Sequence, residues 1–143
     1  MANGKSNQLG TLGELKAISE FIKLDFNIYV PLSGKEPYDF IACKENKLIK
    51  VQVKSTSCKT KNNSYEIGIK SVRSNRTTNI IKRFKPSQCD ILATYIQPLD
   101  KICFIKASAV TSGGCITFRE SFSNYNRNEQ KLISDYTDLS KIV

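Results

Sequence analysis

Hydrophobic residues recur every three or four positions in the first part of the chain. The repeating positions are Leu9, Leu12, Leu15, Ile18 and Ile22. Side chains with this spacing lie on one face of an α-helix. The pattern therefore predicts an amphipathic helix over Asn7–Leu24.

After this helix the pattern changes to short apolar runs separated by polar turns, which is typical of strands. The predicted strands are Asn27–Val30, Tyr38–Cys43, Leu48–Lys54, Ser64–Lys70, Asp90–Gln97 and Lys101–Lys106. In the fourth run Tyr65, Ile67 and Ile69 alternate and are predicted to point inward. The last two runs are predicted to form a hairpin around Pro98-Leu99-Asp100.

Two polar stretches, Ser55–Asn63 and Ser71–Asn79, are predicted to be loops, and the second is rich in Ser, Arg, Thr and Asn. Beyond Ala107 we expect a short helix, a turn at Gly113-Gly114 and a helical stretch near Asn128–Ser134. A helix followed mainly by strands, with no repeat or linker, indicates an α/β fold. The length of the chain predicts a single domain over residues 1–143.

The second and third predicted strands, joined by a short polar turn, carry the most informative residues. If Cys43 pairs with Leu48, Asp39 lies directly across from Gln52, with the Cβ atoms about 5 Å apart. Because side chains alternate along a strand, Asp39, Gln52 and Lys54 then project from one face. The opposite face is apolar and suited to packing on a helix; it carries Phe40, Ala42, Ile49, Val51 and Val53. A register slip of one residue would exchange the two faces.

Glu14 lies upstream, at the edge of the apolar stripe of the predicted helix. Taken singly, each candidate has an ordinary explanation. Asp39 is compatible with a turn residue, Lys54 with a solvated strand end, and Glu14 with a first-turn acid that favours the helix dipole. The combination of a helix acid, a strand acid and Gln-x-Lys favours a functional site made of Glu14, Asp39, Gln52 and Lys54.

Oxygen ligands of this kind suit a hard divalent cation, Mg²⁺ or Mn²⁺. In phosphodiester hydrolysis such an ion neutralises charge on the phosphate and lowers the pKa of the attacking water. Asp39 is the expected central ligand, with the amide oxygen of Gln52 and the backbone carbonyl of Val53 beside it. Glu14 is expected to contribute directly or through water. Lys54 is expected to orient the water or to stabilise the charged transition state.

Composition narrows the possible chemistry. The chain has no histidine, which excludes Ser-His-Asp and Cys-His hydrolases and His-ligated zinc sites. Its five cysteines are odd in number and lack C-x-x-C spacing, which favours a reducing compartment. No apolar run is long enough to span a bilayer and no signal-peptide core is present, so we expect a cytoplasmic protein without a membrane partner.

The net charge of +9 is unevenly distributed along the chain. Between Lys54 and Lys85 basic residues greatly outnumber acids, of which Glu66 is the only one. A one-sided basic block of this kind is typical of a surface that binds a polyanion, and double-stranded DNA is the expected partner.

Within this block the residue types suggest two kinds of DNA contact. Arginine and asparagine recognise base edges, whereas lysine and arginine also bind phosphates. The candidates for base reading are Arg73, Arg76 and Asn79, and those for backbone contacts are Lys82, Arg83 and Lys85. Lys59 and Lys61, in the preceding polar loop, are further candidates.

The segment from Leu12 to Ser55, with Glu14, Asp39 and the run Gln52-Val53-Lys54, resembles the core of small PD-(D/E)XK nucleases. It departs from the usual pattern at Gln52, where most members have an acid. The resemblance implies a restriction-endonuclease-like core, in which a central mixed sheet is flanked by helices.

Within that family the pattern is most similar to that of intron-encoded homing endonucleases of bacteria. This resemblance implies magnesium-dependent, site-specific cleavage of double-stranded DNA at an intron insertion site by a homo-oligomer, a dimer or tetramer. Two alternatives stay open. One is a structure-specific endonuclease of the Holliday-junction type, and the other is a non-catalytic DNA-binding protein with a decayed nuclease site.

Overall fold

The computed structural model describes residues 2–74, 77–111, 113–125 and 129–143. It begins with one long helix, α1 (Ala2–Lys23). The strands that follow are β1 (Asn27–Tyr29), β2 (Phe40–Lys44), β3 (Lys47–Thr56), β4 (Ser64–Gly68), β5 (Ser71–Ser74), β6 (Asn79–Lys82), β7 (Ile91–Ile96), β8 (Lys101–Lys106), β9 (Cys115–Arg119) and β10 (Lys131–Leu132).

Five of these strands form a mixed sheet in the order β1-β2-β3-β7-β8. β3 and β7 pair in parallel, whereas the other neighbours pair antiparallel, including the predicted hairpin of β7 and β8. A second sheet has the order β10-β9-β4. The predicted mixed α/β class is confirmed.

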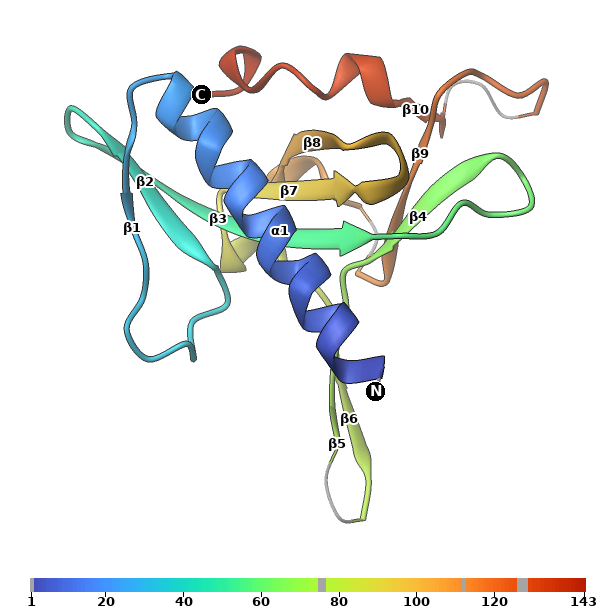
Figure 1. The fold of residues 1–143 in the computed structure, drawn as a ribbon, viewed down its shortest axis with the longest axis horizontal. Coiled ribbons are helices and arrows are strands. Elements are labelled where there is room, and N and C mark those ends of the chain that lie inside the picture. Colours follow the sequence, from blue (N-terminus) through green and yellow to red (C-terminus); the bar gives the residue numbers. More distant parts are fainter. Residues whose placement is uncertain (1, 75–76, 112, 126–128) are drawn as a thin grey trace.

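The two faces of the five-stranded sheet are covered differently. α1 crosses one face (Figure 1), where the Phe21 ring packs edge-on against Phe40 with 5.6 Å between the ring centroids. On the other face, where a further helix was expected, the β10-β9-β4 sheet packs instead, and Leu92 shares a buried core with Ile67 and Phe118. The sheet is thereby held between a helix and a smaller sheet.

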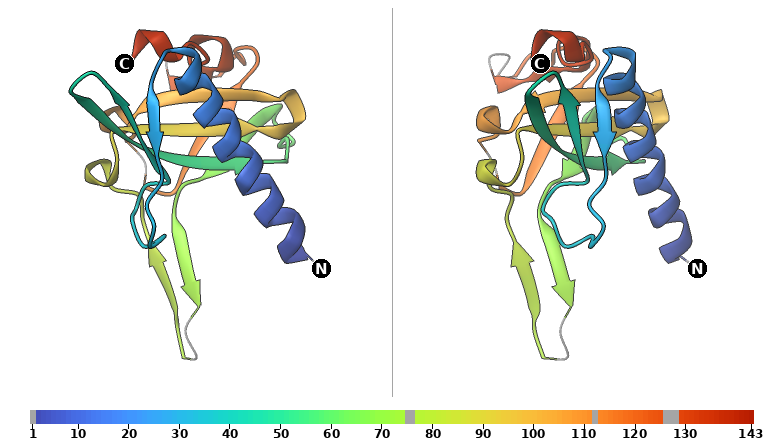
Figure 2. Two further views of the ribbon diagram at one scale, coloured as in Figure 1. Left: turned by 60° about the vertical axis from the view of Figure 1, so that its left-hand side comes forward. Right: turned by 90° about the vertical axis from the view of Figure 1, so that its left-hand side faces the viewer.

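β5 and β6 form a separate two-stranded ribbon that projects away from the body of the molecule (Figures 1 and 2). The prediction of a loop over Ser71–Asn79 is wrong at both ends, because Ser71 pairs with Lys82 and Ser74 with Asn79. The side chains of Ile80 and Ile81 are exposed although they are adjacent in β6. With two adjacent apolar residues, β6 lacks the alternation of apolar and polar residues that identifies other strands.

The polar loop after β3 and the C-terminal part also differ from the prediction. β3 continues to Thr56, which pairs with Ile96, so the loop is shorter than expected. The helical stretch predicted near Asn128–Ser134 is wrong over its described part, where β10 is followed by a 3-10 turn, Ile133–Asp135. Pairing of β10 with β9 and burial of Ile133 outweigh the weak local helical pattern.

The five cysteines are free thiols. None of the helices in the described ranges combines the length and apolar character needed to cross a membrane.

Candidate active site

The register of the β2–β3 hairpin is the predicted one. Cys43 pairs with Leu48, and the last pair of the ladder is Phe40 with Val51. The next residues outward are Asp39 and Gln52. The sequence therefore predicts the pairing that places Asp39 beside Gln52.

Asp39 is held at the end of this ladder by two hydrogen bonds to β3. Its backbone N–H donates to the carbonyl of Val51 over 2.8 Å. Its Oδ2 atom accepts from the backbone N–H of Val53 over 2.6 Å. Because these bonds fall on either side of Gln52, the Asp39 carboxylate is fixed next to that residue.

Glu14 reaches the same region from α1. Burial raises the pKa of the Glu14 carboxyl above its ordinary value, and the negative charge of Asp39 raises it further. Burial also raises the pKa of Asp39, although the bond from Val53 and the positive charge of Lys54 act in the opposite direction. Glu14 and Lys54 are therefore both close enough to Asp39 to interact electrostatically with it.

Gln52 contributes an oxygen with no partner of its own. Within the described part of the chain, the buried Oε1 atom of Gln52 has no hydrogen-bond donor. A buried carbonyl oxygen without a partner is costly, and such an atom in a native structure points to a ligand that would satisfy it. Gln52 thus stands beside Asp39 with a free acceptor.

Gln52 and Lys54 line a pocket of about 250 Å³. One wall is the segment before Asp39, which contributes Lys35 and Glu36. The opposite wall is the base of the β5–β6 ribbon and the chain that follows it, with lining residues Ser71, Lys82, Arg83, Phe84 and Gln88. Four cationic side chains and one carboxylate line this pocket, so it has a positive potential that suits a phosphate.

The predicted DNA-binding residues are distributed over several parts of the structure. Lys82 and Arg83 line the pocket. Lys85 is exposed just beyond them, and the backbones of Arg73 and Asn79 lie in β5 and β6. Arg76 lies outside the described residues.

Lys59 and Lys61 belong instead to the loop between β3 and β4. The Nζ atom of Lys59 lies 3.8 Å from the Glu120 carboxylate. Sequence reasoning missed several pocket residues, among them Lys35 and Gln88. Both belong to connecting segments, and no periodic pattern marks a connecting segment as part of a site.

The donor set at Asp39 fits a hard cation. Two carboxylates, the free amide oxygen of Gln52 and the nearby backbone of Val53 are oxygen donors, which Mg²⁺ and Mn²⁺ prefer. Across the described ranges, no three His, Cys, Asp or Glu side chains gather as a metal-binding group. At this site Gln52 supplies a neutral oxygen beside the two carboxylates.

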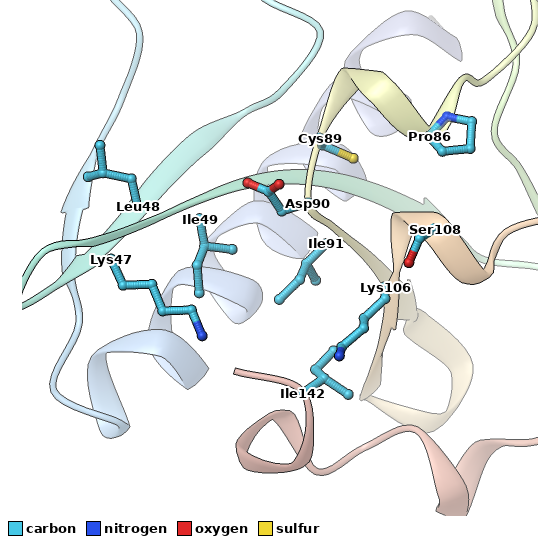
Figure 3. A pocket seen from close by; sticks show the side chains of 10 residues that line it. All are labelled: Lys47, Leu48, Ile49, Pro86, Cys89, Asp90, Ile91, Lys106, Ser108 and Ile142. Carbon is cyan, nitrogen blue, oxygen red and sulfur yellow. The ribbon is translucent and has the colours of Figure 1, made fainter.

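A second pocket, of about 330 Å³, lies elsewhere on the fold (Figure 3). Lys47 enters it from β3 and Lys106 from β8, over an apolar floor that includes Ile49 and Ile91. It shares no lining residue with the pocket of Gln52 and Lys54. The two pockets are therefore separate sites on the fold.

Comparison with known proteins agrees with this geometry. The family model of the PD-(D/E)XK endonucleases matches residues 4–139. The chain therefore belongs to the PD-(D/E)XK endonuclease family and is a nuclease by that membership.

A solved structure described as a bacterial homing endonuclease, I-Ssp6803I, has the same fold. The two chains are 22% identical, with a TM-score of 0.74 over 92% of this chain and 87% of that chain. At this level of identity the likeness establishes the fold. No curated protein matches the chain significantly.

Proposed function

We propose that this protein is a metal-dependent, site-specific endonuclease of double-stranded DNA that acts in intron homing. The observation that carries the proposal is the meeting of Asp39, Glu14 and the free oxygen of Gln52 beside the basic pocket of Lys54. Family membership supplies the reaction class, and the solved homing endonuclease of the same fold supports the biological role.

The groups that would hold Mg²⁺ or Mn²⁺ are Asp39, Glu14, Gln52 and the Val53 carbonyl. Such an ion supplies charge neutralisation at the phosphate and a more acidic bound water. The protein fixes its donors in advance, because the two backbone bonds of Asp39 restrict the carboxylate to one orientation. Gln52 lowers the negative charge of the site, which makes Glu14 more important for binding the cation.

Lys54 has a different part in the reaction. Its positive charge acts on Asp39, and its side chain lines the pocket into which a phosphate fits. A cation in this position stabilises negative charge that develops on the phosphate oxygens during hydrolysis. Lys35, Lys82 and Arg83 line the same pocket and would bind neighbouring phosphates.

We expect cleavage and stability to respond to pH in opposite directions. Because the pKa values of Glu14 and Asp39 are raised, both acids stay protonated to a higher pH than ordinary carboxyls. Cleavage should increase as pH rises, because a cation binds the deprotonated carboxylates. The stability of the metal-free protein should decrease over the same window, from the ordinary carboxyl pKa values up to the raised ones, because the folded state favours the protonated forms.

Cleavage rates and urea unfolding of the metal-free protein over the same pH series test this expectation. The double variant Glu14→Gln, Asp39→Asn is the control for stability, and its unfolding free energy should vary less across the window. An unchanged pH profile of stability in that variant would show that these two carboxyls are not the groups that titrate.

We propose that the β5–β6 ribbon reads the target DNA. It projects away from the body of the molecule (Figure 2), and Lys82 and Arg83 at its base line the pocket. Arg76→Ala should weaken binding by about 1–3 kcal/mol at one base position. Lys85→Ala should weaken all sequences and lower the slope of log affinity against log salt by roughly 0.9.

A salt titration with a panel of single-base-substituted targets measures both effects. Lys141→Ala is the control, since it removes an exposed charge near the C-terminal end. If Arg76→Ala and Lys85→Ala weaken all sequences equally, or neither weakens any, the ribbon is not the reading element.

We propose that the protein acts as a homo-oligomer, a dimer or a tetramer. On α1 the apolar side chains Leu15 and Ile22 are 58% and 55% exposed. Nearby in the chain Tyr29, Val30 and Leu32 are also exposed. Sedimentation equilibrium should give a dimer or tetramer that Leu15→Glu weakens. A monomer at every concentration would contradict the proposal.

Comparison of two substrates tests the type of endonuclease. The same sequence is presented as a linear duplex containing the target and as a four-way junction, with Mg²⁺. Site-specific cleavage predicts that the duplex is cut. Cutting of the junction alone would establish the structure-specific alternative, and binding without cutting of either substrate would indicate a decayed site.

A further inference from the structure

The β5–β6 ribbon, which projects from the body of the molecule (Figure 2), presents two adjacent isoleucines to solvent. Ile80 is 47% exposed and Ile81 is 58% exposed. At the base of the ribbon, in contrast, Ile69 and Phe84 are buried in the core. Burial of an exposed aliphatic side chain against a partner is favourable. The ribbon would therefore gain affinity wherever its partner offers an apolar group.

The base of the ribbon is fixed to the body by backbone hydrogen bonds. Ile69, two residues before β5, donates its N–H to the Gly114 carbonyl over 3.0 Å. Phe84, two residues after β6, donates its N–H to the Gly113 carbonyl over 3.0 Å. These bonds, together with the burial of both side chains, set the direction in which each face of the ribbon points.

One face of the ribbon is continuous with the basic pocket. Ser71 and Lys82 are paired in the ladder, and both line this pocket together with Ile69 and Phe84. Because side chains alternate along a strand, Ile80 projects from the same face as Lys82. Ile80 lies two residues, about 7 Å, farther out along the ribbon. The face that leads away from the pocket thus carries an exposed aliphatic side chain.

Ile81 projects from the opposite face. In the register it stands opposite Val72, whereas Ile80 stands opposite Arg73. Two β-branched residues across from each other suit a two-stranded ribbon in its own right. Arg83 also lines the pocket, but it follows the last residue of β6, where the alternation of the ladder no longer applies. The apolar side chain at position 80 has no such explanation within the ribbon.

We propose that Ile80 is a specificity-determining residue that contacts the 5-methyl group of a thymine in the target DNA. This inference rests on the proposed function of the ribbon as the reading element. A two-stranded ribbon fits the major groove of B-DNA, where thymine presents an apolar methyl group among the polar base edges. DNA with a phosphate in the basic pocket would meet the face that carries Ile80.

Charge and apolar contact then have separate roles on this face. Lys82 and Arg83 line the pocket and attract phosphates whatever the base sequence. Ile80 carries no charge, so its contribution depends on the base that it meets. Loss of the thymine methyl group should weaken binding about fourfold, the factor that corresponds to burial of one methylene-sized group.

Deoxyuridine tests the contact, because it differs from thymidine only in lacking this methyl group. The target is obtained by repeated selection of random duplexes that bind the parent protein in excess chelator, so cleavage plays no part. Each thymine of the selected site is then replaced singly by deoxyuridine. Binding to the parent should weaken about fourfold at one thymine per bound copy of the protein.

Two variants assign this effect to one side chain. Ile80→Ala should bind the thymine target about fourfold or more weakly than the parent does. It should bind the deoxyuridine target as tightly as the thymine target, because the two changes remove the same contact. Ile81→Ala is the matched control, with the same residue type on the opposite face, and should keep the fourfold deoxyuridine effect. Sedimentation of the free proteins should give both variants the oligomeric state of the parent.

The inference is overturned if no deoxyuridine substitution weakens binding to the parent, if the effect persists in Ile80→Ala, or if Ile81→Ala loses it equally. Equal weakening of all sequences by Ile80→Ala, without a deoxyuridine effect, would indicate an apolar wedge between base steps. A changed oligomeric state in Ile80→Ala would place Ile80 in a subunit contact. Either of these results would also overturn the thymine contact.

Failure of the proposed function gives different results. A parent protein that shows the deoxyuridine effect through Ile80, but cuts no DNA in Mg²⁺, would retain the thymine contact and lose the nuclease role. A parent protein that cuts DNA in Mg²⁺, but selects no recurrent sequence, would retain the nuclease role and lose the thymine contact.

Discussion

Asp39→Asn is expected to reduce DNA cleavage at least about a hundredfold while DNA binding stays close to that of the parent. Asparagine keeps the size of the side chain and an oxygen that accepts the hydrogen bond from Val53, so the end of the β2–β3 hairpin should stay intact. The substitution removes the charge that would hold the cation. Single-turnover cleavage and a binding titration on the same DNA measure the two effects.

Asp90→Asn is the matched control for this experiment. The Asp90 Oδ2 atom also accepts a bond from a backbone N–H of β3, that of Lys50, over 2.8 Å. Asp90 lines the separate pocket of Figure 3. Cleavage by Asp90→Asn should stay close to the parent rate. Turnover of Asp39→Asn within about tenfold of the parent would refute a role for Asp39 as a metal ligand.

Lys54→Ala should lower the cleavage rate by roughly 10²–10³, the range measured when one group that stabilises a charged transition state is removed. The loss is expected because of the position of Lys54. Its positive charge acts to lower the pKa of Asp39, and its side chain lines the basic pocket. The dependence of the rate on Mg²⁺ concentration should change much less than the maximal rate.

Lys50→Ala is the control for charge on the same strand. Lys50 lies four residues before Lys54, and its Nζ atom lies 5.5 Å from the centroid of the Tyr38 ring. The loss of this exposed contact should leave the maximal rate near that of the parent. A normal rate in Lys54→Ala, or an equal loss in Lys50→Ala, would remove Lys54 from the reaction.

The site was predictable from the sequence where local patterns fix the geometry. A short polar turn and the alternation of apolar residues determine that Cys43 faces Leu48. This register alone places Asp39 next to Gln52, whatever the arrangement of the rest of the fold. The periodic apolar positions of α1 predict the helix but not the face that packs on the sheet, because Leu15 and Ile22 are exposed. The buried residues of α1 include Ala17 and Phe21, which stand outside the predicted stripe.

The remaining features depend on contacts between segments that are distant in the sequence. The two walls of the basic pocket meet only in the folded chain, so Lys35 and Gln88 carry no local signal. The strands of the β5–β6 ribbon are short and flank a polar stretch, and β6 carries two adjacent apolar residues, so no alternating pattern marks them as strands. The space beside Gly13 of α1 is limited by β3, since a Cβ atom there would lie 2.1 Å from Ser55 Oγ, and the sequence of the helix does not contain this neighbour.

The most direct test of the account is the incubation of supercoiled plasmids carrying random inserts with the parent protein, Mg²⁺ and, in parallel, an excess of chelator. The account predicts linear product in Mg²⁺ alone, with ends that fall at one recurrent sequence. The contradictory result is a parent protein that binds these plasmids in Mg²⁺ or Mn²⁺ and leaves all of them uncut.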